Sequence, residues 1–147
     1  MRKIPTNLPQ EIEIKIELLR QVNSQEECLQ KAYELLIKKY HGNRLKTLTH
    51  FFELFSRSLE ELWARDGFMH CTNLNWLLRT LLVRSGHFTE HDITAHWTLL
   101  WYVSPHQYLR VTMKDGRRVN VDTWAHTYGI PFGDYAHGFH AYGNSSS

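Results

Sequence analysis

Residues 106–122 read HQYLRVTMKDGRRVNVD, two alternating segments around a Gly-containing turn, and this stretch decides the fold class. If the loop has three residues and its glycine is left-handed, Val119 faces Val111 across the two strands. Val121 then faces Leu109, whereas a two-residue loop pairs both valines with polar residues. Because a shift of one residue moves every side chain to the other face, we predict the three-residue loop in an antiparallel hairpin.

The second face of the predicted hairpin is polar and carries His106, Tyr108 and Asp122. The register puts Asp122 opposite Tyr108 and diagonal to His106. Side chains in diagonal positions lie within reach of each other when they are long. We therefore expect a hydrogen bond between His106 and Asp122.

The part of the chain before the hairpin has apolar residues at helical spacing. Ser24 and Glu27 form a capping box that begins one helix, and Gly42 is its expected C-terminal cap. Two more helices are expected over about 45–65 and 71–84, the second closed by Gly86. Residues 11–19 alternate like a strand but have a helix-favouring composition, so both interpretations stay open.

Helices first and an antiparallel sheet second are typical of an α+β domain. The chain has 147 residues, 42% of them apolar, which is enough for one core without a disulfide or metal. We expect one domain over residues 1–147, helical to about 86, with the sheet part over about 87–143 and a frayed tail at 144–147.

Charge and targeting patterns exclude several classes of partner. The 17 basic and 15 acidic side chains form no Lys/Arg block, so nucleic acid and membrane surfaces are not expected partners. The N-terminal residues lack the apolar stretch of a signal peptide, and no apolar run is long enough for a bilayer. Two cysteines make no disulfide framework. We expect a cytoplasmic protein.

Cys71 is the candidate nucleophile, because it begins a predicted helix. Unpaired N–H groups and the helix dipole at that end favour the thiolate. A thiol nucleophile also needs a base, and the base needs a carboxylate that orients it. His106 and Asp122 supply these roles. The backbone N–H of Cys71 is one expected oxyanion donor, with Trp63 or Tyr40 as candidates for the second.

Two stretches resemble the transglutaminase-like superfamily of papain-like cysteine enzymes. The segment GFMHC at 67–71 with its Leu-rich helix is similar to the nucleophile helix of that family. Residues 106–123 are similar to its histidine strand, turn and aspartate strand, and the resemblance covers about 63–135. It implies a papain-like fold, a catalytic triad of Cys71, His106 and Asp122, a thioester intermediate, and no metal or other cofactor.

The resemblance also implies an activity, acyl transfer from a peptide, protein or amide substrate. A chain of 147 residues leaves little room for an acceptor site, which favours a hydrolase. Two alternatives stay open. One is a transglutaminase or N-acyltransferase that uses an amine acceptor, and the other is an inactive module that binds a peptide or protein.

Other residues compete for these roles. A lone helical cysteine is usually a small buried apolar residue, and this is our interpretation of Cys28. His96 is the nearest rival to His106, but it adjoins a predicted interior strand. Residues 129–139, rich in Gly and aromatic residues, either cover the sheet edge or form a wall of the substrate cleft beside Asp122.

A zinc site is a weaker interpretation. His87, Glu90 and His91 have the spacing of one helical face, and His137 and His140 lie three apart. The residues directly after Gly86 predict a loop rather than a helix, and no second cysteine accompanies Cys71.

Overall fold

A computed structural model describes residues 2–42, 58–100 and 104–137 as a mixed α+β structure. The helices are α1 (Gln10–Arg20), α2 (Gln25–Lys39), α4 (Leu59–Trp63) and α5 (Cys71–Arg84), with 3-10 helices η2 (Glu90–Asp92) and η3 (Trp124–Tyr128). The strands are β1 (Tyr40–His41), β2 (Gly67–Phe68), β3 (Ile93–Leu100), β4 (Ser104–Thr112) and β5 (Arg118–Val121). This confirms the predicted α+β class, with the sheet after the main helices.

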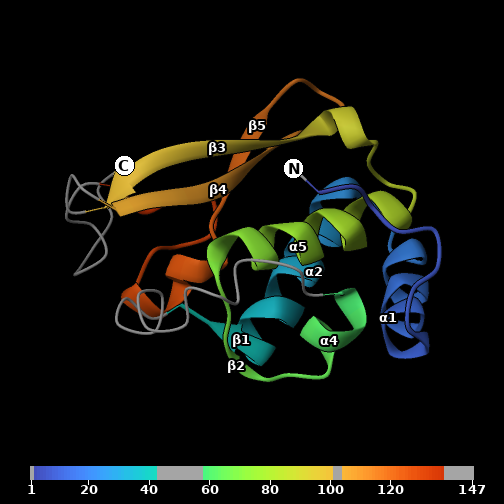
Figure 1. The fold of residues 1–147 in the computed structure, drawn as a ribbon. Coiled ribbons are helices and arrows are strands. Elements are labelled where there is room, and N and C mark those ends of the chain that lie inside the picture. The colour runs from blue at the N-terminus through green and yellow to red at the C-terminus, as the bar shows by residue number, and fades with distance from the viewer. Residues whose placement is uncertain (1, 43–57, 101–103, 138–147) are drawn as a thin grey trace.

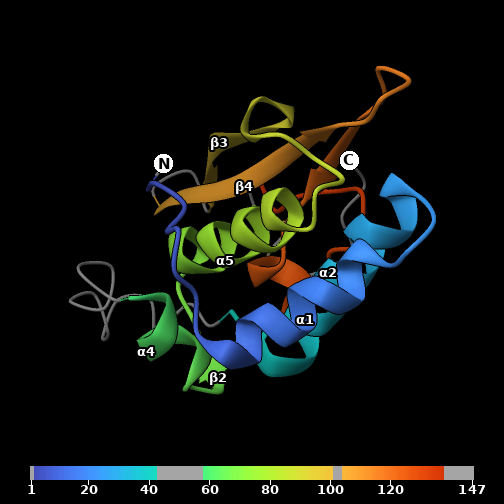
Figure 2. The ribbon, with the colours of Figure 1, turned by 90° about the vertical axis from the view of Figure 1, so that its right-hand side faces the viewer.

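Helix α5 lies between the sheet and the two N-terminal helices (Figures 1 and 2). The sheet has the antiparallel order β3-β4-β5, and α5 packs against its central strand β4. On the other side α5 contacts α1 and α2. Helix α5 is therefore buried along much of its length and held from two sides.

The core fills the space around α5. Leucines at helical spacing along α5 meet the apolar face of the hairpin, and each side chain buried there contributes roughly 1.5–3 kcal/mol. The fully buried members include Leu74, Leu77, Leu78, Leu81 and Leu82 from α5, with Leu109, Val111 and Val121 from the sheet. Packing of this kind fixes the rotation of α5 about its own axis.

The hairpin has the predicted three-residue register. Val111 pairs with Val119 and Leu109 with Val121. Gly116 has φ +90, which is the left-handed conformation that the loop requires. The prediction that decides the fold class is therefore confirmed at the level of individual residue pairs.

The undecided segment 11–19 lies within helix α1. Ile12, Ile16 and Leu19 are buried at a spacing of four and three residues, while Ile14 and Leu18 are exposed. The strand-like alternation arose because both helical faces carry apolar residues. Composition, not alternation, was the correct signal here.

Helix α2 begins as predicted, but the prediction that Gly42 is its C-terminal cap is wrong. The Ser24 hydroxyl accepts a hydrogen bond from the Glu27 N–H, at 3.1 Å. The helix ends at Lys39, and Tyr40 is already extended, in β1, which pairs in parallel with β2. The buried Tyr40 hydroxyl donates to the Leu62 carbonyl at 2.6 Å, which anchors the chain in this extended path.

Of the helix expected over 45–65, only residues 58–65 are described, and there the prediction of one continuous helix is wrong, because Ser58 is extended and α4 begins only at Leu59. There α4 is capped by Ser58, whose hydroxyl accepts from the Glu61 N–H at 3.1 Å. Helix α5 ends as predicted, because Gly86 follows it with φ +84. Within the described ranges, no helix has the length and apolar character needed to cross a bilayer.

Candidate active site

His106 and Asp122 form a buried pair on neighbouring parts of the hairpin. His106 is the third residue of β4, and Asp122 directly follows β5. The imidazole Nε2 lies 2.7 Å from the Asp122 Oδ2, and the two residues are only 2% and 3% exposed. The predicted diagonal contact is confirmed as a short hydrogen bond. This arrangement fixes the ring orientation of His106.

Asp122 is itself held by the chain that follows it. Its Oδ1 accepts a hydrogen bond from the Ala125 N–H, in the first turn of η3, at 3.1 Å. Its Oδ2 also accepts from the Ala136 N–H at 2.9 Å. Because an ionised carboxylate has acceptor sites only, it can take both of these bonds and the one from His106.

Cys71 is the first residue of α5, and its side chain lies close enough to His106 to raise the pKa of the imidazole. Asp122 occupies Nε2, so Nδ1 is the ring nitrogen left for the thiol. The residue before Cys71, His70, makes no side-chain cap, and the first turn of α5 holds no acidic residue. A helix N-terminus stabilises negative charge, and no carboxylate in this first turn competes for its N–H groups.

His106 favours its charged form. Burial lowers the pKa of His106, but the Asp122 carboxylate outweighs this, and the Cys71 side chain adds to the increase. The net effect raises the pKa of His106 from 6.5 to about 10. The Trp124 ring, centred 4.9 Å from the imidazole, helps to exclude water from it. His106 is thus an imidazolium held by the Asp122 carboxylate.

The raised pKa of His106 predicts how stability depends on pH. Because folding raises this pKa from 6.5 to about 10, the pair stabilises the fold fully below pH 6.5 and loses its effect as pH rises through 10. We compare wild type with His106→Gln, which keeps an N–H donor but does not titrate. The difference in their free energies of unfolding should shrink between about pH 6.5 and 10. A difference that grows with pH would mean a neutral histidine in the folded state.

A second connection, which we did not predict, ties α5 to β4 close to Cys71. The Asn75 Nδ2 donates to the backbone carbonyl of Gln107 at 3.0 Å and to its Oε1 at 3.1 Å. Asn75 is four residues after Cys71, and Gln107 is next to His106. The bonds thus set the distance between the helix that carries the thiol and the strand that carries the base. The sequence did not predict these bonds, because no pattern of neighbouring residues marks two buried amides that meet across a helix and a strand.

Replacement of Asn75 by Ala should weaken both the fold and the site. The change leaves two buried oxygens of Gln107 without this donor, which costs roughly 1–3 kcal/mol. We expect that loss in urea unfolding, together with slower alkylation of Cys71 near pH 6. The matched control is Asn120→Ala, because Asn120 bonds Arg110 at 3.2 Å in a partly exposed position. Equal losses in both variants would argue against a special role for Asn75.

The two candidates for the second oxyanion donor, Tyr40 and Trp63, have different surroundings. Tyr40 is excluded, because its hydroxyl donates to the Leu62 carbonyl. Trp63 is buried in α4, with the Lys39 ammonium 5.2 Å from the centre of its ring. Its role stays a prediction, as does that of the Cys71 N–H.

The segment after η3 covers one edge of the sheet. Gly133 makes an antiparallel bridge with Asn120 of β5, and the Tyr135 ring stacks on Tyr108 with 4.0 Å between ring centres. With the bond from Ala136 to Asp122, these contacts support the edge-covering interpretation of this segment. The alternative, a wall of the substrate cleft, stays a prediction, and residues 138 and 139 lie outside the described part.

Among the described residues, His96, the rival to His106, has no carboxylate partner of the kind that Asp122 gives His106. Its Nε2 lies 2.9 Å from the Thr94 hydroxyl, and its pKa is lowered by burial and by Arg110 and Arg118. Strand β3 is an outer strand of the described sheet rather than an interior one, which corrects our prediction. His96 therefore lacks the environment of a general base.

The structure also shows the surroundings of Cys28 and of the residues suggested as zinc ligands. Cys28 is fully buried, as predicted, with its sulfur 3.3 Å from the Ser85 hydroxyl oxygen. Within the described ranges, no group of three His, Cys, Asp or Glu side chains could hold a metal ion. Glu90 of the suggested zinc site lies 3.7 Å from Arg79 instead, and His140 falls outside those ranges.

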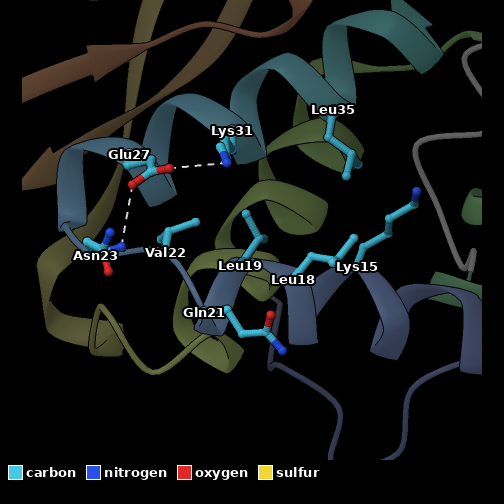
Figure 3. A pocket seen from close by; sticks show the side chains of 9 residues that line it. All are labelled: Lys15, Leu18, Leu19, Gln21, Val22, Asn23, Glu27, Lys31 and Leu35. Carbon is cyan, nitrogen blue, oxygen red and sulfur yellow. Dashed lines mark hydrogen bonds and ion pairs between the residues drawn. The ribbon is translucent and has the colours of Figure 1, made fainter.

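A surface hollow elsewhere lies between α1 and α2 (Figure 3). Its lining residues all come from 15–35: Lys15, Leu18, Leu19, Gln21, Val22, Asn23, Glu27, Lys31 and Leu35. On the α2 side of the hollow, Lys31 forms an ion pair with Glu27 at 3.1 Å. This hollow shares no residue with the group formed by Cys71, His106 and Asp122.

Comparison of the chain with protein-family models, with curated proteins and with solved structures finds no match. The functional argument therefore depends on the geometry of Cys71, His106 and Asp122.

Proposed function

We propose that the chain is a thiol-dependent acyl-transfer enzyme of the transglutaminase-like, papain-like type. The observation that carries this proposal is the 2.7 Å hydrogen bond between His106 and Asp122, whose carboxylate accepts two further hydrogen bonds. Cys71, at the start of a helix, lies beside the same imidazole. A buried His–Asp pair next to a partly exposed thiol supplies a nucleophile, its base and the group that orients the base.

The reaction that we propose has two steps. The Cys71 sulfur attacks the carbonyl carbon, a C–S bond forms, and His106 gives its proton to the leaving amine as the C–N bond breaks. Neutral His106 then takes a proton from water, which attacks the thioester carbonyl and releases the acid and Cys71. Asp122 stays ionised and keeps the imidazole in place throughout. No metal or other cofactor takes part in this scheme.

Hydrolysis of a peptide or amide bond is the form of this chemistry that we favour, because water can attack the thioester without a second binding site. An amine acceptor would make the same thioester serve a transferase. A second candidate function, an inactive peptide-binding or protein-binding module, is favoured by one observation. His106 is only 2% exposed, so a leaving group reaches it only if the site opens.

The test of this proposal is turnover of a library of N-acyl peptide aminocoumarin amides. Wild type should release aminocoumarin, and acid quenching should trap an acyl group on Cys71 that mass spectrometry detects. Cys71→Ala should lose both signals, while Cys28→Ala, which changes only the buried thiol, should keep them. Added glycine ethyl ester separates the two reactions, since faster amide formation than hydrolysis would indicate a transferase. A folded wild type that never forms the thioester would support the binding module.

A further inference from the structure

The sheet face that carries His106 also carries two arginines. Because side chains alternate between the two faces of a strand, the strand pairing places Arg110 of β4 and Arg118 of β5 on this face. Arg110 follows His106 by four residues, which is about 13 Å along the strand. The central strand β4 lies between β3 and β5 (Figure 1), and none of the three contains an acidic residue. We call Arg110 and Arg118 the arginine pair.

Arg110 is held in place by neutral partners. Its Nε donates to the Asn120 Oδ1 at 3.2 Å, and its Nη2 donates to the Tyr108 hydroxyl at 3.4 Å. The residue is partly buried, and a charge in such a place usually has a partner of opposite charge. Among the residues that the structure describes, no carboxylate pairs with Arg110. The guanidinium is therefore oriented, its charge is not neutralised, and it has further N–H donors to offer.

Arg118 adds a second positive charge of the same kind. Since Arg110 pairs with Asn120, Arg118 lies diagonal to Arg110 on the neighbouring strand, within reach for long side chains. Arg118 is exposed and, in the described part of the chain, forms no ion pair, whereas the preceding Arg117 pairs with Asp115 and Glu26.

His96 reports the electrostatic environment of the arginine pair. It is the strand partner of Tyr108, so it lies on the same face and diagonal to Arg110. Burial lowers the pKa of His96, and the charges of Arg110 and Arg118 lower it further. Both guanidiniums thus lie close enough to act on one imidazole. This part of the face is positively charged and favours an anion.

A row of contacts joins the arginine pair to the candidate active site. The Tyr108 hydroxyl accepts from Arg110, and the Tyr108 ring stacks on Tyr135 with 4.0 Å between ring centres. The residue after Tyr135, Ala136, donates its N–H to Asp122 at 2.9 Å. The arginine pair therefore belongs to the same face and the same set of contacts as the carboxylate that orients His106.

We propose that Arg110 and Arg118 form a recognition site for a carboxylate side chain in an acidic segment of the peptide or protein substrate. A guanidinium matches a carboxylate with two parallel hydrogen bonds, and a guanidinium that is already oriented loses less entropy on binding. An extended peptide spans about 3.3 Å per residue, so the acidic residue would lie about four residues from the reacting carbonyl. The link to a substrate rests on the proposed function, whereas the position of the site rests on strand pairing and hydrogen bonds.

The first test measures binding without catalysis. Backbone amide NMR signals of β4 and β5 are followed while acetyl-Thr-Glu-Thr-Glu-Thr-amide is added, and then with the matched peptide that has Gln in place of Glu. We expect saturable shifts with the acidic peptide and at least about tenfold weaker binding of the Gln peptide, the factor that one charged hydrogen bond supplies. Equal affinities, or no shifts at millimolar acidic peptide, overturn the inference. Inorganic phosphate at the same ionic strength is the third ligand, and tighter binding of phosphate than of the acidic peptide also overturns it.

Variants decide whether the arginine pair causes this preference. Arg110→Gln and Arg118→Gln should each weaken binding of the acidic peptide by about tenfold and leave the Gln peptide unaffected. Arg110→Lys keeps the charge without the planar fork, so it should lose less than Arg110→Gln. The matched control is Arg117→Gln, because it makes the same change in net charge at an arginine that already has carboxylate partners. An equal loss in Arg117→Gln and Arg118→Gln would assign the effect to net charge and overturn the inference.

A second measurement separates this inference from the proposed function. Among the aminocoumarin amides, those with acidic residues should have the lower KM, and Arg118→Gln should raise that KM while kcat stays unchanged. Acidic-peptide binding without turnover of any amide keeps the site and removes the proposed function. Turnover with equal affinity for both peptides keeps the function and removes the site. An acidic peptide that binds at the arginine pair but gives no lower KM overturns the role of the pair in substrate recognition.

Discussion

Asp122→Ala should lower the free energy of unfolding by about 3–5 kcal/mol, the cost of breaking a buried ion pair by removing one partner. The substitution leaves the N–H groups of Ala125 and Ala136, both in fully buried residues, without their acceptor. It also leaves a buried imidazole without the charge that raises its pKa. Urea unfolding at pH 7 measures the loss, and alkylation of Cys71 at pH 6 should slow by at least about tenfold in variants that still fold.

Two companion variants make the Asp122 result specific. Asp66→Ala removes an exposed carboxylate that pairs with Lys39, and should cost roughly 1 kcal/mol or less. Asp122→Asn keeps the shape but presents an amide N–H₂ and no charge, so it should fold better than Asp122→Ala and still slow the alkylation of Cys71. If Asp122→Asn alkylates as fast as wild type at pH 6, the carboxylate charge is not needed for the reactivity of the thiol.

Gly42→Ala should be the most disruptive small substitution outside the triad. A methyl group at Gly42 would overlap the backbone oxygen of Trp124 and lie 2.5 Å from its Cδ2. Because backbone atoms cannot rotate away, η3 must shift, and overpacking of this kind costs about 1–3 kcal/mol or more. The Trp124 ring contacts the His106 ring, so we expect slower alkylation of Cys71 as well as lower stability.

The control for Gly42→Ala is Gly86→Ala. Gly86 has φ +84, and apart from its two chain neighbours no heavy atom of the described residues lies within 4 Å of an added methyl group. Its substitution therefore carries only the left-handed strain, roughly 1–2 kcal/mol, with no contact to the site. We expect Gly86→Ala to keep the wild-type alkylation rate at Cys71. Normal reactivity in a folded Gly42→Ala protein would show that Trp124 does not position His106.

Local patterns in the sequence were enough to predict the hairpin and the helix that carries Cys71. The register was predictable because only one loop length puts Val119 opposite Val111, and that register brings His106 to Asp122 without further assumptions. Helix α5 was predictable because its leucines recur at helical spacing and Gly86 follows its last turn. These features depend on residues close together in the chain.

Features that depend on distant residues were not predictable. Gly42 has the local context of a helix cap, but its actual role is to let Trp124, far along the chain, approach it. The bond from Ala136 to Asp122 joins a loop to the hairpin, and the Asn75–Gln107 bond joins a helix to a strand. Each requires the tertiary arrangement to be known first. Sequence periodicity describes faces and ends of elements, but not which buried amide meets which.

The central claim is that Cys71 and His106 form a thiolate–imidazolium pair oriented by Asp122. The most direct measurement is the rate of iodoacetamide labelling at Cys71 against pH, with Cys28 as the internal control. Burial raises the pKa of the Cys28 thiol, more than its contact with Ser85 lowers it, so Cys28 should stay unlabelled. The account predicts fast labelling of Cys71 well below the free-thiol pKa of about 8.5, lost in His106→Gln. A Cys71 that labels like a free thiol in both proteins would contradict it.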